Sequence, residues 1–375
     1  MIERKINLKI LIPIVLLSII SIITIYSAMT YTSSSLGNLA LKQGLWYIVG
    51  WILVIIVVKL KNEYFYQFSW YFYIIGNILL LLLLFFGTPI NNSRCWFTIP
   101  GIGSFQPSEF MKIFIMLVLA SMIHSFRSKY KNPGIKEEFI FILKTLVIVG
   151  IPSILTFLQP DTGCVLMYLI IYASMMFVSG LRMRWFATAI FLFTILILGI
   201  MWLYFFKEGL FIKIFGTSIY YRLERIFNWS TGSGLQLENA LAAIGSAGLF
   251  GHGYNNTPIY FPESSTDFIF AVYASNFGLL GVFILFAIII FLDINIFTLT
   301  RKKIEDTNKY IIAGILGMLL FQQIQNIGMT IGLFPITGIT LPFISYGGSS
   351  LLSYMLLVGI LLNISVKKNR TYHYR

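Results

Sequence analysis

Ten apolar runs, each long enough to cross a bilayer as a helix, constrain this chain more than any other feature of its sequence. They cover residues 10–29, 43–60, 67–86, 109–126, 139–157, 163–180, 186–206, 268–297, 309–332 and 350–366. Since 58% of the 375 residues are hydrophobic and only 11% are charged, the composition excludes a soluble domain. We therefore predict an all-α polytopic membrane protein with about ten transmembrane helices, forming a single integral membrane domain over residues 1–375.

The basic residues predict the orientation of these helices. With the N-terminus inside, the cytoplasmic segments hold 19 of the 27 Lys and Arg residues and the outer segments hold six. The first run follows a basic N-terminus as in a signal peptide, but no small-residue cleavage site follows it, so we interpret it as a retained span. Both termini are then expected in the cytoplasm. The charge bias also explains the net charge of +13 without nucleic acid as a partner.

A large outer loop, residues 207–267, is predicted between spans seven and eight. It is the one long interval that apolar residues do not dominate, and it carries five of the 14 acidic residues. At its end, Asp267 directly precedes an apolar helical pattern. The carboxylate either favours the helix N-terminus electrostatically or acts as a partly desolvated general base in an outward-facing cavity, with a raised pKa. Asp267 is our candidate catalytic residue.

Other polar residues near the predicted outer ends of spans are candidate substrate contacts. Glu109 and Lys112 share one helix face and can pair, either as a structural ion pair or as a substrate-lining pair. Arg94 with Trp96 would bind a phosphate and stack on a sugar, or anchor the chain at lipid headgroups. Arg222, in an amphipathic segment, has the same two interpretations.

Two connections break the helical pattern at membrane depth. Residues 158–162 contain Pro160 and Asp161, and residues 333–350 contain two prolines and three glycines without any charge. Backbone of this kind must be buried in protein or line a wet cavity, because lipid cannot satisfy its amides. The chain has two cysteines, Cys95 and Cys164, both predicted at the outer membrane edge. They either lie close enough to pair or are independent free thiols.

Several ordered segments resemble the shape, elongation, division and sporulation family of membrane proteins, which includes RodA and FtsW. The resemblance covers nearly the whole chain. The segments that carry it are SRCW with FQPSEFMK (93–112), FLQPDTG (157–163), ENALAAIGSAGLFGHG (238–253), PESSTDFIFAV (262–272) and NIGMTIGLFPITGITLPFISYGGSS (326–350).

This resemblance implies a peptidoglycan glycosyltransferase in the bacterial cytoplasmic membrane. Such a protein would polymerise lipid II on the outer face, for elongation, division or sporulation, together with a class B penicillin-binding protein and surrounding membrane lipids. The essential aspartate of the family corresponds to Asp267, and its paired glutamate and lysine correspond to Glu109 and Lys112. Asp161, Ser345 and Ser349 lie in the resembling segments and are further candidate substrate contacts.

The chain departs from the family pattern after the helix start that follows Asp267. Two glutamates are usual where this chain has Ser275 and Asn276. Such glutamates would position a divalent cation, Mg²⁺ or Mn²⁺, or tune Asp267. Their absence leaves open a catalytically weak scaffold for the penicillin-binding protein. A transporter of lipid-linked precursors also stays open, because Glu109 with Lys112 and the broken segments at 158–162 and 333–350 are features common in transporters.

Overall fold

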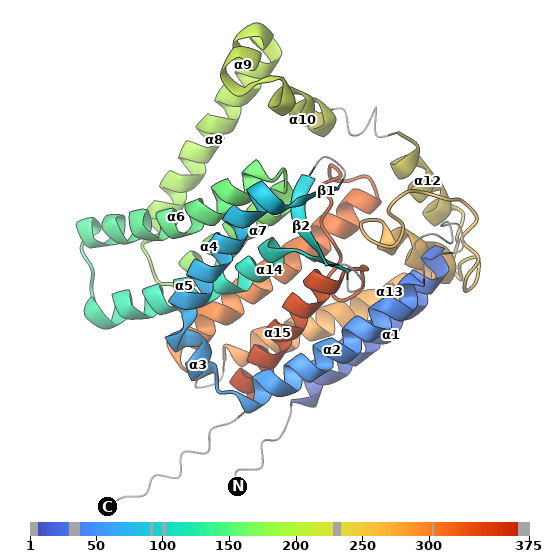
Figure 1. Ribbon diagram of the computed structural model, residues 1–375, viewed down its shortest axis with the longest axis horizontal. Helices are drawn as coiled ribbons and strands as arrows, with labels where there is room; N and C mark the ends of the chain where they lie inside the picture. The colour runs from blue at the N-terminus through green and yellow to red at the C-terminus, as the bar shows by residue number, and fades with distance from the viewer. Residues whose placement is uncertain are drawn as a thin grey trace, which may run out of the picture.

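A computed structural model describes residues 7–29, 38–90, 93–99, 103–227, 234–301 and 304–366. Helices dominate it (Figure 1). The first half contains α1 (Leu8–Ala28), α2 (Leu39–Lys59), α3 (Asn62–Gln67), α4 (Ser69–Phe86), α5 (Pro107–Lys129), α6 (Ile135–Leu158) and α7 (Thr162–Val178). The second half contains α8 (Met183–Phe206), α9 (Glu208–Phe215), α10 (Thr217–Phe227), α12 (Gly234–Gly245), α13 (Ile269–Leu299), α14 (Asp306–Thr330) and α15 (Gly348–Ser365).

The long helices reproduce the ten predicted apolar runs. Within the described ranges, nine helices have the length and composition to cross a membrane, and α7, with 17 residues, is a shorter apolar helix. Each begins and ends within a few residues of its predicted run. The polytopic helical class is confirmed, whereas the exact number of crossings and the outer position of residues 207–267 stay predictions.

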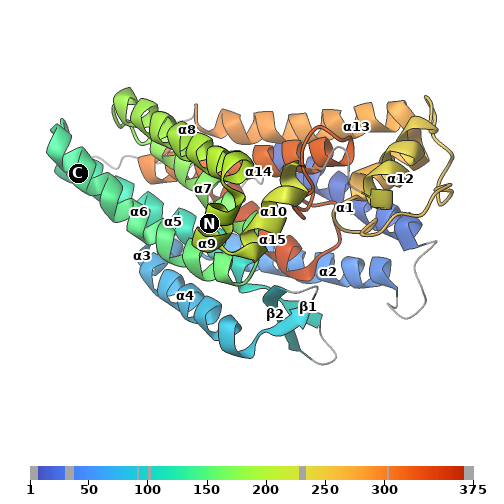
Figure 2. The same ribbon diagram turned by 90° about the horizontal axis from the view of Figure 1, so that it is seen from above.

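A small antiparallel sheet, which the sequence did not lead us to expect, interrupts the helices. It consists of β1 (Thr88–Ile90), β2 (Ser93–Ile99) and β3 (Gly103–Phe105), with β2 in the centre. Cross-strand pairing sets Phe97 opposite Phe105. Figure 2 shows the sheet beside the end of α4, on the opposite side of the bundle from α13. The strands lead into α5, whose start carries Pro107, a residue suited to the first turn of a helix.

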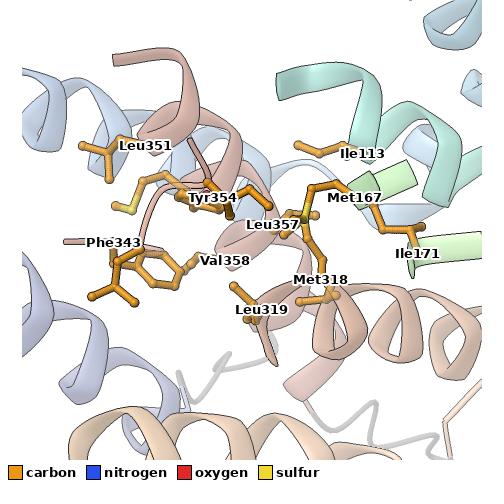
Figure 3. Packing of buried hydrophobic residues seen from close by; sticks show 14 of the residues in the cluster. Ile113, Met167, Ile171, Met318, Leu319, Phe343, Leu351, Tyr354, Leu357 and Val358 are labelled. Carbon is orange, nitrogen blue, oxygen red and sulfur yellow. The ribbon is translucent and has the colours of Figure 1, made fainter. Parts of the chain in front are cut away.

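Helices α5, α14 and α15 form the centre of the bundle. The share of buried residues in their most apolar stretch is 61% for α5 and α14 and 72% for α15. Figure 3 shows side chains of these helices and of α7 converging, with Ile113, Met167, Met318 and Tyr354 among them. Helices α2, α4 and α6 lie outside this centre and expose apolar side chains on one face.

Helix α8 differs from the others because none of its side chains is buried. In Figure 1, α8 extends away from the bundle to α9, and α10 turns back in the direction of α12. A predominantly apolar helix whose central turns are exposed on all sides is stable in hydrocarbon but not in water. We infer that lipid surrounds α8.

Helix α13 consists of two helical segments that meet at Gly278, where φ is 62° and ψ is −164°. The turn at 248–253 supplies the hydrogen bonds that the break removes. The amides of His252 and Gly253 donate to the carbonyls of Ser275 and Asn276, and the carbonyls of Gly248 and Leu249 accept from the amides of Leu279 and Leu280. These four backbone groups, which the break leaves without partners inside the helix, are thus all hydrogen-bonded. Within a bilayer such partners must come from the protein, because lipid offers none.

Candidate active site

Asp267 lies in a turn immediately before α13. The residue that caps the helix is Phe268, and it makes no side-chain capping hydrogen bond. Asp267 therefore does not cap α13 through its side chain, and its electrostatic effect on the helix start stays a prediction. In the part of the chain that the structure describes, no hydrogen-bond donor contacts the Asp267 carboxylate, which keeps only part of its surface accessible. Burial, and to a lesser degree the charge of Glu263, raise the pKa of Asp267 from 3.8 to about 7.

The main chain around Asp267 rests on the segment between α14 and α15. Asn326 of α14 donates its Nδ2 to the carbonyl of Asp267 and to that of Ile339, each at 2.8 Å. The hydroxyl of Ser345 donates to the carbonyl of Thr266 at 2.7 Å. Gly338 faces the carboxylate, since a Cβ at this position would lie 3.6 Å from Asp267 Oδ2. Ser345 therefore binds the chain beside the catalytic candidate, and its predicted contact with substrate stays a prediction.

Polar residues of α1 and α2 hold the same segment from the other side. Gln43 donates to the carbonyl of Ser345 at 3.3 Å and accepts from the amide of Gly347 at 3.3 Å. Ser21 donates to the carbonyl of Ile344 at 2.7 Å, and the Tyr47 hydroxyl donates to that of Phe343. Phe343 has a φ of 65°, a conformation that costs energy for an aromatic residue and persists only where its surroundings fix it.

Glu109 and Lys112 form an ion pair inside the bundle, with 2.7 Å between Lys112 Nζ and Glu109 Oε2. The two residues are 7% and 1% exposed, so neither lines an open surface in this conformation. Lys112 Nζ also lies 5.4 Å from the ring centre of Tyr354, whose hydroxyl contacts that of Thr340 at 3.3 Å. This geometry favours the structural ion pair, and a role in binding substrate stays a prediction.

Asp161 and Ser349 stabilise the entry into α5. The Asp161 carboxylate accepts from Gln106 Nε2 at 2.9 Å, from Ser108 Oγ at 3.1 Å and from the amide of Cys164 at 3.0 Å. Ser349 Oγ accepts from the amide of Gln106 at 2.9 Å. These interactions occupy both carboxylate oxygens of Asp161 and the hydroxyl of Ser349. Both residues therefore stabilise the fold in this structure, and their contact with substrate stays a prediction.

The two arginine candidates lie elsewhere. Arg94 is exposed on β2 and Trp96, on the same strand, is half-buried. Arg222 belongs to α10, but its side chain lies outside the described residues. A phosphate site that combines Arg94 or Arg222 with Asp267 stays a prediction.

The cysteines do not pair. Cys95 and Cys164 are both free and buried. Cys95 Sγ donates to the carbonyl of Gln159 at 2.9 Å, and Cys164 Sγ points to Glu109 Oε1 at 3.8 Å. Burial, assisted by the charge of Asp161, raises the pKa of the Cys95 thiol to about 12. The pairing interpretation is therefore wrong, because each thiol is packed against a different acceptor.

Ser275 and Asn276 lie within α13, and no described hydrogen bond joins either side chain to Asp267. The Asn276 amide accepts from Thr257 Oγ1 at 3.0 Å and donates to Ser27 Oγ at 2.5 Å, which links the segment before α13 to α1. Ser275 lies eight residues after Asp267, roughly 12 Å along a helix. Among the residues that the structure describes, no group of three or more His, Cys, Asp or Glu side chains could hold a metal ion. The predicted divalent cation stays untested.

Asn326 and Gln43 are functional candidates that the sequence interpretation missed. Both lie in apolar runs, and neither exposes any of its surface. A buried amide within a membrane-spanning segment is costly unless it has partners, which makes such a residue a signal for function in its own right. This signal was present in the sequence.

The fold and the site define a class of protein: a polytopic helical membrane protein with a partly desolvated carboxylate at one end of a buried polar network. The chain matches the family model of the FtsW, RodA and SpoVE cell cycle proteins over residues 8–370. It belongs to this family.

Relatives and solved structures agree with this membership. The chain is 34% identical to a probable peptidoglycan glycosyltransferase FtsW of Coxiella burnetii, over 84% of this chain and 82% of that protein. It is 30% identical to the Enterococcus hirae protein of the same name, over 98% and 94%. A peptidoglycan synthase complex, studied for the coordination of polymerization and crosslinking, contains a chain with the same fold (TM-score 0.78, 23% identity, 96% and 97% covered). RodA of Thermus thermophilus also shares the fold (TM-score 0.69, 24% identity, 96% of both chains).

Proposed function

We propose that this protein is a peptidoglycan glycosyltransferase of the bacterial cytoplasmic membrane, which polymerises lipid II with Asp267 as the general base. One observation carries the assignment of the base. Asp267 has a carboxylate that receives no hydrogen bond from the described residues and keeps partial access to its surroundings, and burial raises its pKa to about 7. A base with a pKa close to the working pH combines a useful ionised fraction with good proton affinity.

In the proposed reaction, the sugar 4-hydroxyl oxygen of the acceptor attacks the anomeric carbon of the donor. The new glycosidic bond forms as the bond to the pyrophosphate oxygen breaks, and the hydroxyl proton passes to the Asp267 carboxylate. Undecaprenyl pyrophosphate leaves with the bonding electron pair. A single base is sufficient for one inverting displacement, unlike the paired carboxylates usual in glycoside hydrolysis.

The exposed apolar surface of the bundle supports the choice of substrate. Lipid-linked sugars reach such a site sideways from the bilayer, and the described helices expose apolar faces to it. Arg94 and Arg222 are proposed to stabilise the pyrophosphate charge. The proposed partner is a class B penicillin-binding protein, since the similar synthase complex couples polymerization with crosslinking.

Replacement of Asp267 by Asn tests the proposal, because it retains side-chain size but removes the base. We expect glycan formation from purified lipid II to fall roughly 10²-fold or more. The wild type and the variant would be compared with the partner present, at equal amounts of folded protein judged by size exclusion and thermal unfolding. Near-normal polymerisation by the variant would remove Asp267 from the mechanism, and an inactive wild type would favour the scaffold function.

A further inference from the structure

Asn326 connects two segments that lie on opposite sides of the catalytic candidate. Its Nδ2 group donates one hydrogen bond to the Asp267 carbonyl and another to the Ile339 carbonyl, both at 2.8 Å. Asn326 exposes none of its surface and lies in α14, one of the helices at the centre of the bundle. The amide orientation is unambiguous, because two carbonyl oxygens require a donor between them.

The two residues that accept these hydrogen bonds are Asp267 itself, the proposed base, and the neighbour of the residue that lies against its carboxylate. Asp267 bears the carboxylate, and Ile339 follows Gly338, the residue whose α-carbon faces Asp267 Oδ2. The carboxylate receives no hydrogen bond of its own from the described residues. Its place is therefore set through the main chain, by Asn326 at Asp267 and by Ser345 at the preceding Thr266.

We propose that Asn326 is a positioning residue for Asp267, which holds the carboxylate against Gly338 in the geometry that accepts the proton of the attacking hydroxyl. This inference rests on the proposed function. Asn326 transfers no proton and contacts Asp267 only through the main chain. Its contribution is to fix the distance between the Asp267 carboxylate and the main chain at Gly338, which shields one side of the carboxylate from water.

The substitution Asn326→Leu tests this role, since leucine has a similar volume but no donor. Misplacement of a catalytic group by about 1 Å can cost roughly 10²-fold in rate. We expect kcat to fall about 10- to 100-fold, with KM for lipid II changed less than about threefold. The acid limb of the pH–rate profile should also move to lower pH, because a carboxylate released from Gly338 regains water and loses part of the burial that raises its pKa.

A readout without turnover separates this inference from the proposed function. The protonation of Asp267 would be followed by infrared difference spectroscopy, with Asp267→Asn used to assign the carboxyl band. The midpoint in Asn326→Leu should lie below that of the wild type. An inactive wild type would overturn the function alone, whereas equal midpoints in the two proteins would overturn the positioning role, whatever the activity.

Two further variants control for folding. Asn295→Ala removes another buried amide, which donates to the Phe291 carbonyl within α13, and should leave kcat and the midpoint unchanged. Asn326→Gln keeps both donors on an arm that is one methylene longer, and it substitutes for the leucine variant if that protein does not fold. Asn326→Gln should lower kcat and the midpoint of Asp267 protonation less than Asn326→Leu does. Equal changes in Asn295→Ala would contradict the inference.

Discussion

At the residue scale, the sequence identifies Asp267 as the proposed base but does not predict the side chains that hold its main chain in place. Asp267 could be recognised because it ends a polar loop and begins an apolar helix within a family motif. Asn326, Gln43 and Ser345 reach their acceptors from other elements, up to 302 residues away along the chain. Such contacts depend on the packing of helices, which periodicity within one helix does not specify.

Burial of Asp267 predicts a dependence of stability on pH. Its pKa in the folded protein is about 7, above the unfolded value of 3.8. The unfolded state therefore loses its proton first, and the wild type loses stability as pH rises between these two values. We expect Asp267→Asn to gain thermal stability over the wild type from pH 4 to pH 7 and to keep a constant advantage above pH 7.

Thermal unfolding in detergent, monitored by circular dichroism at several pH values, measures this difference. Glu263→Gln serves as the control, because Glu263 is exposed and its charge raises the pKa of Asp267 less than burial does. A difference between Asp267→Asn and the wild type that stays the same from pH 4 to pH 7 would contradict the raised pKa.

At the element scale, apolar length predicts helices well and predicts their interruptions poorly. The run at 268–297 appears continuous, yet α13 is broken at Gly278, because a turn from residues 248–253 replaces the missing backbone hydrogen bonds. The sheet of residues 88–105 was also missed. Its strands are three to seven residues long, too short for an alternating pattern to stand out beside the long apolar runs.

The break in α13 predicts that Gly278 tolerates no side chain. A Cβ on Gly278 would lie 2.3 Å from the amide nitrogen of Gly251, and its φ of 62° is strained for any L-residue. We expect Gly278→Ala to lower stability by more than about 2 kcal/mol and to reduce polymerisation by displacing the turn.

Gly199→Ala is the matched control for this variant. Gly199 lies inside α8, and a Cβ there meets nothing within 4 Å. Alanine is favoured over glycine in a helix by roughly 0.5–1 kcal/mol, so this change should be neutral or stabilising. Thermal unfolding of both variants in the same detergent makes the comparison. Equal stability of Gly278→Ala and the wild type would contradict the observed backbone conformation.

At the scale of the whole molecule, the orientation in the membrane can be tested by chemical labelling. Leu235 is 74% exposed on α12, and Asp306 is exposed at the start of α14. In intact cells, an impermeant maleimide should label Leu235→Cys and should not label Asp306→Cys, because the positive-inside rule places them on opposite sides. The native thiols are buried and should contribute little background. The reverse labelling pattern would invert the predicted topology.

The lack of buried side chains in α8 has a consequence for the substitutions that this helix can accept. A side chain that meets only lipid has no particular shape to match, so one apolar residue replaces another there at little cost. In α5, α14 and α15 the neighbouring side chains restrict size and shape at most positions. A complete scan of substitutions would therefore show residues 187–199 of α8 as a stretch that selects for hydrophobicity alone, unlike Trp185 at the start of the helix, which donates to Glu138, and unlike the closely packed positions of α5, α14 and α15.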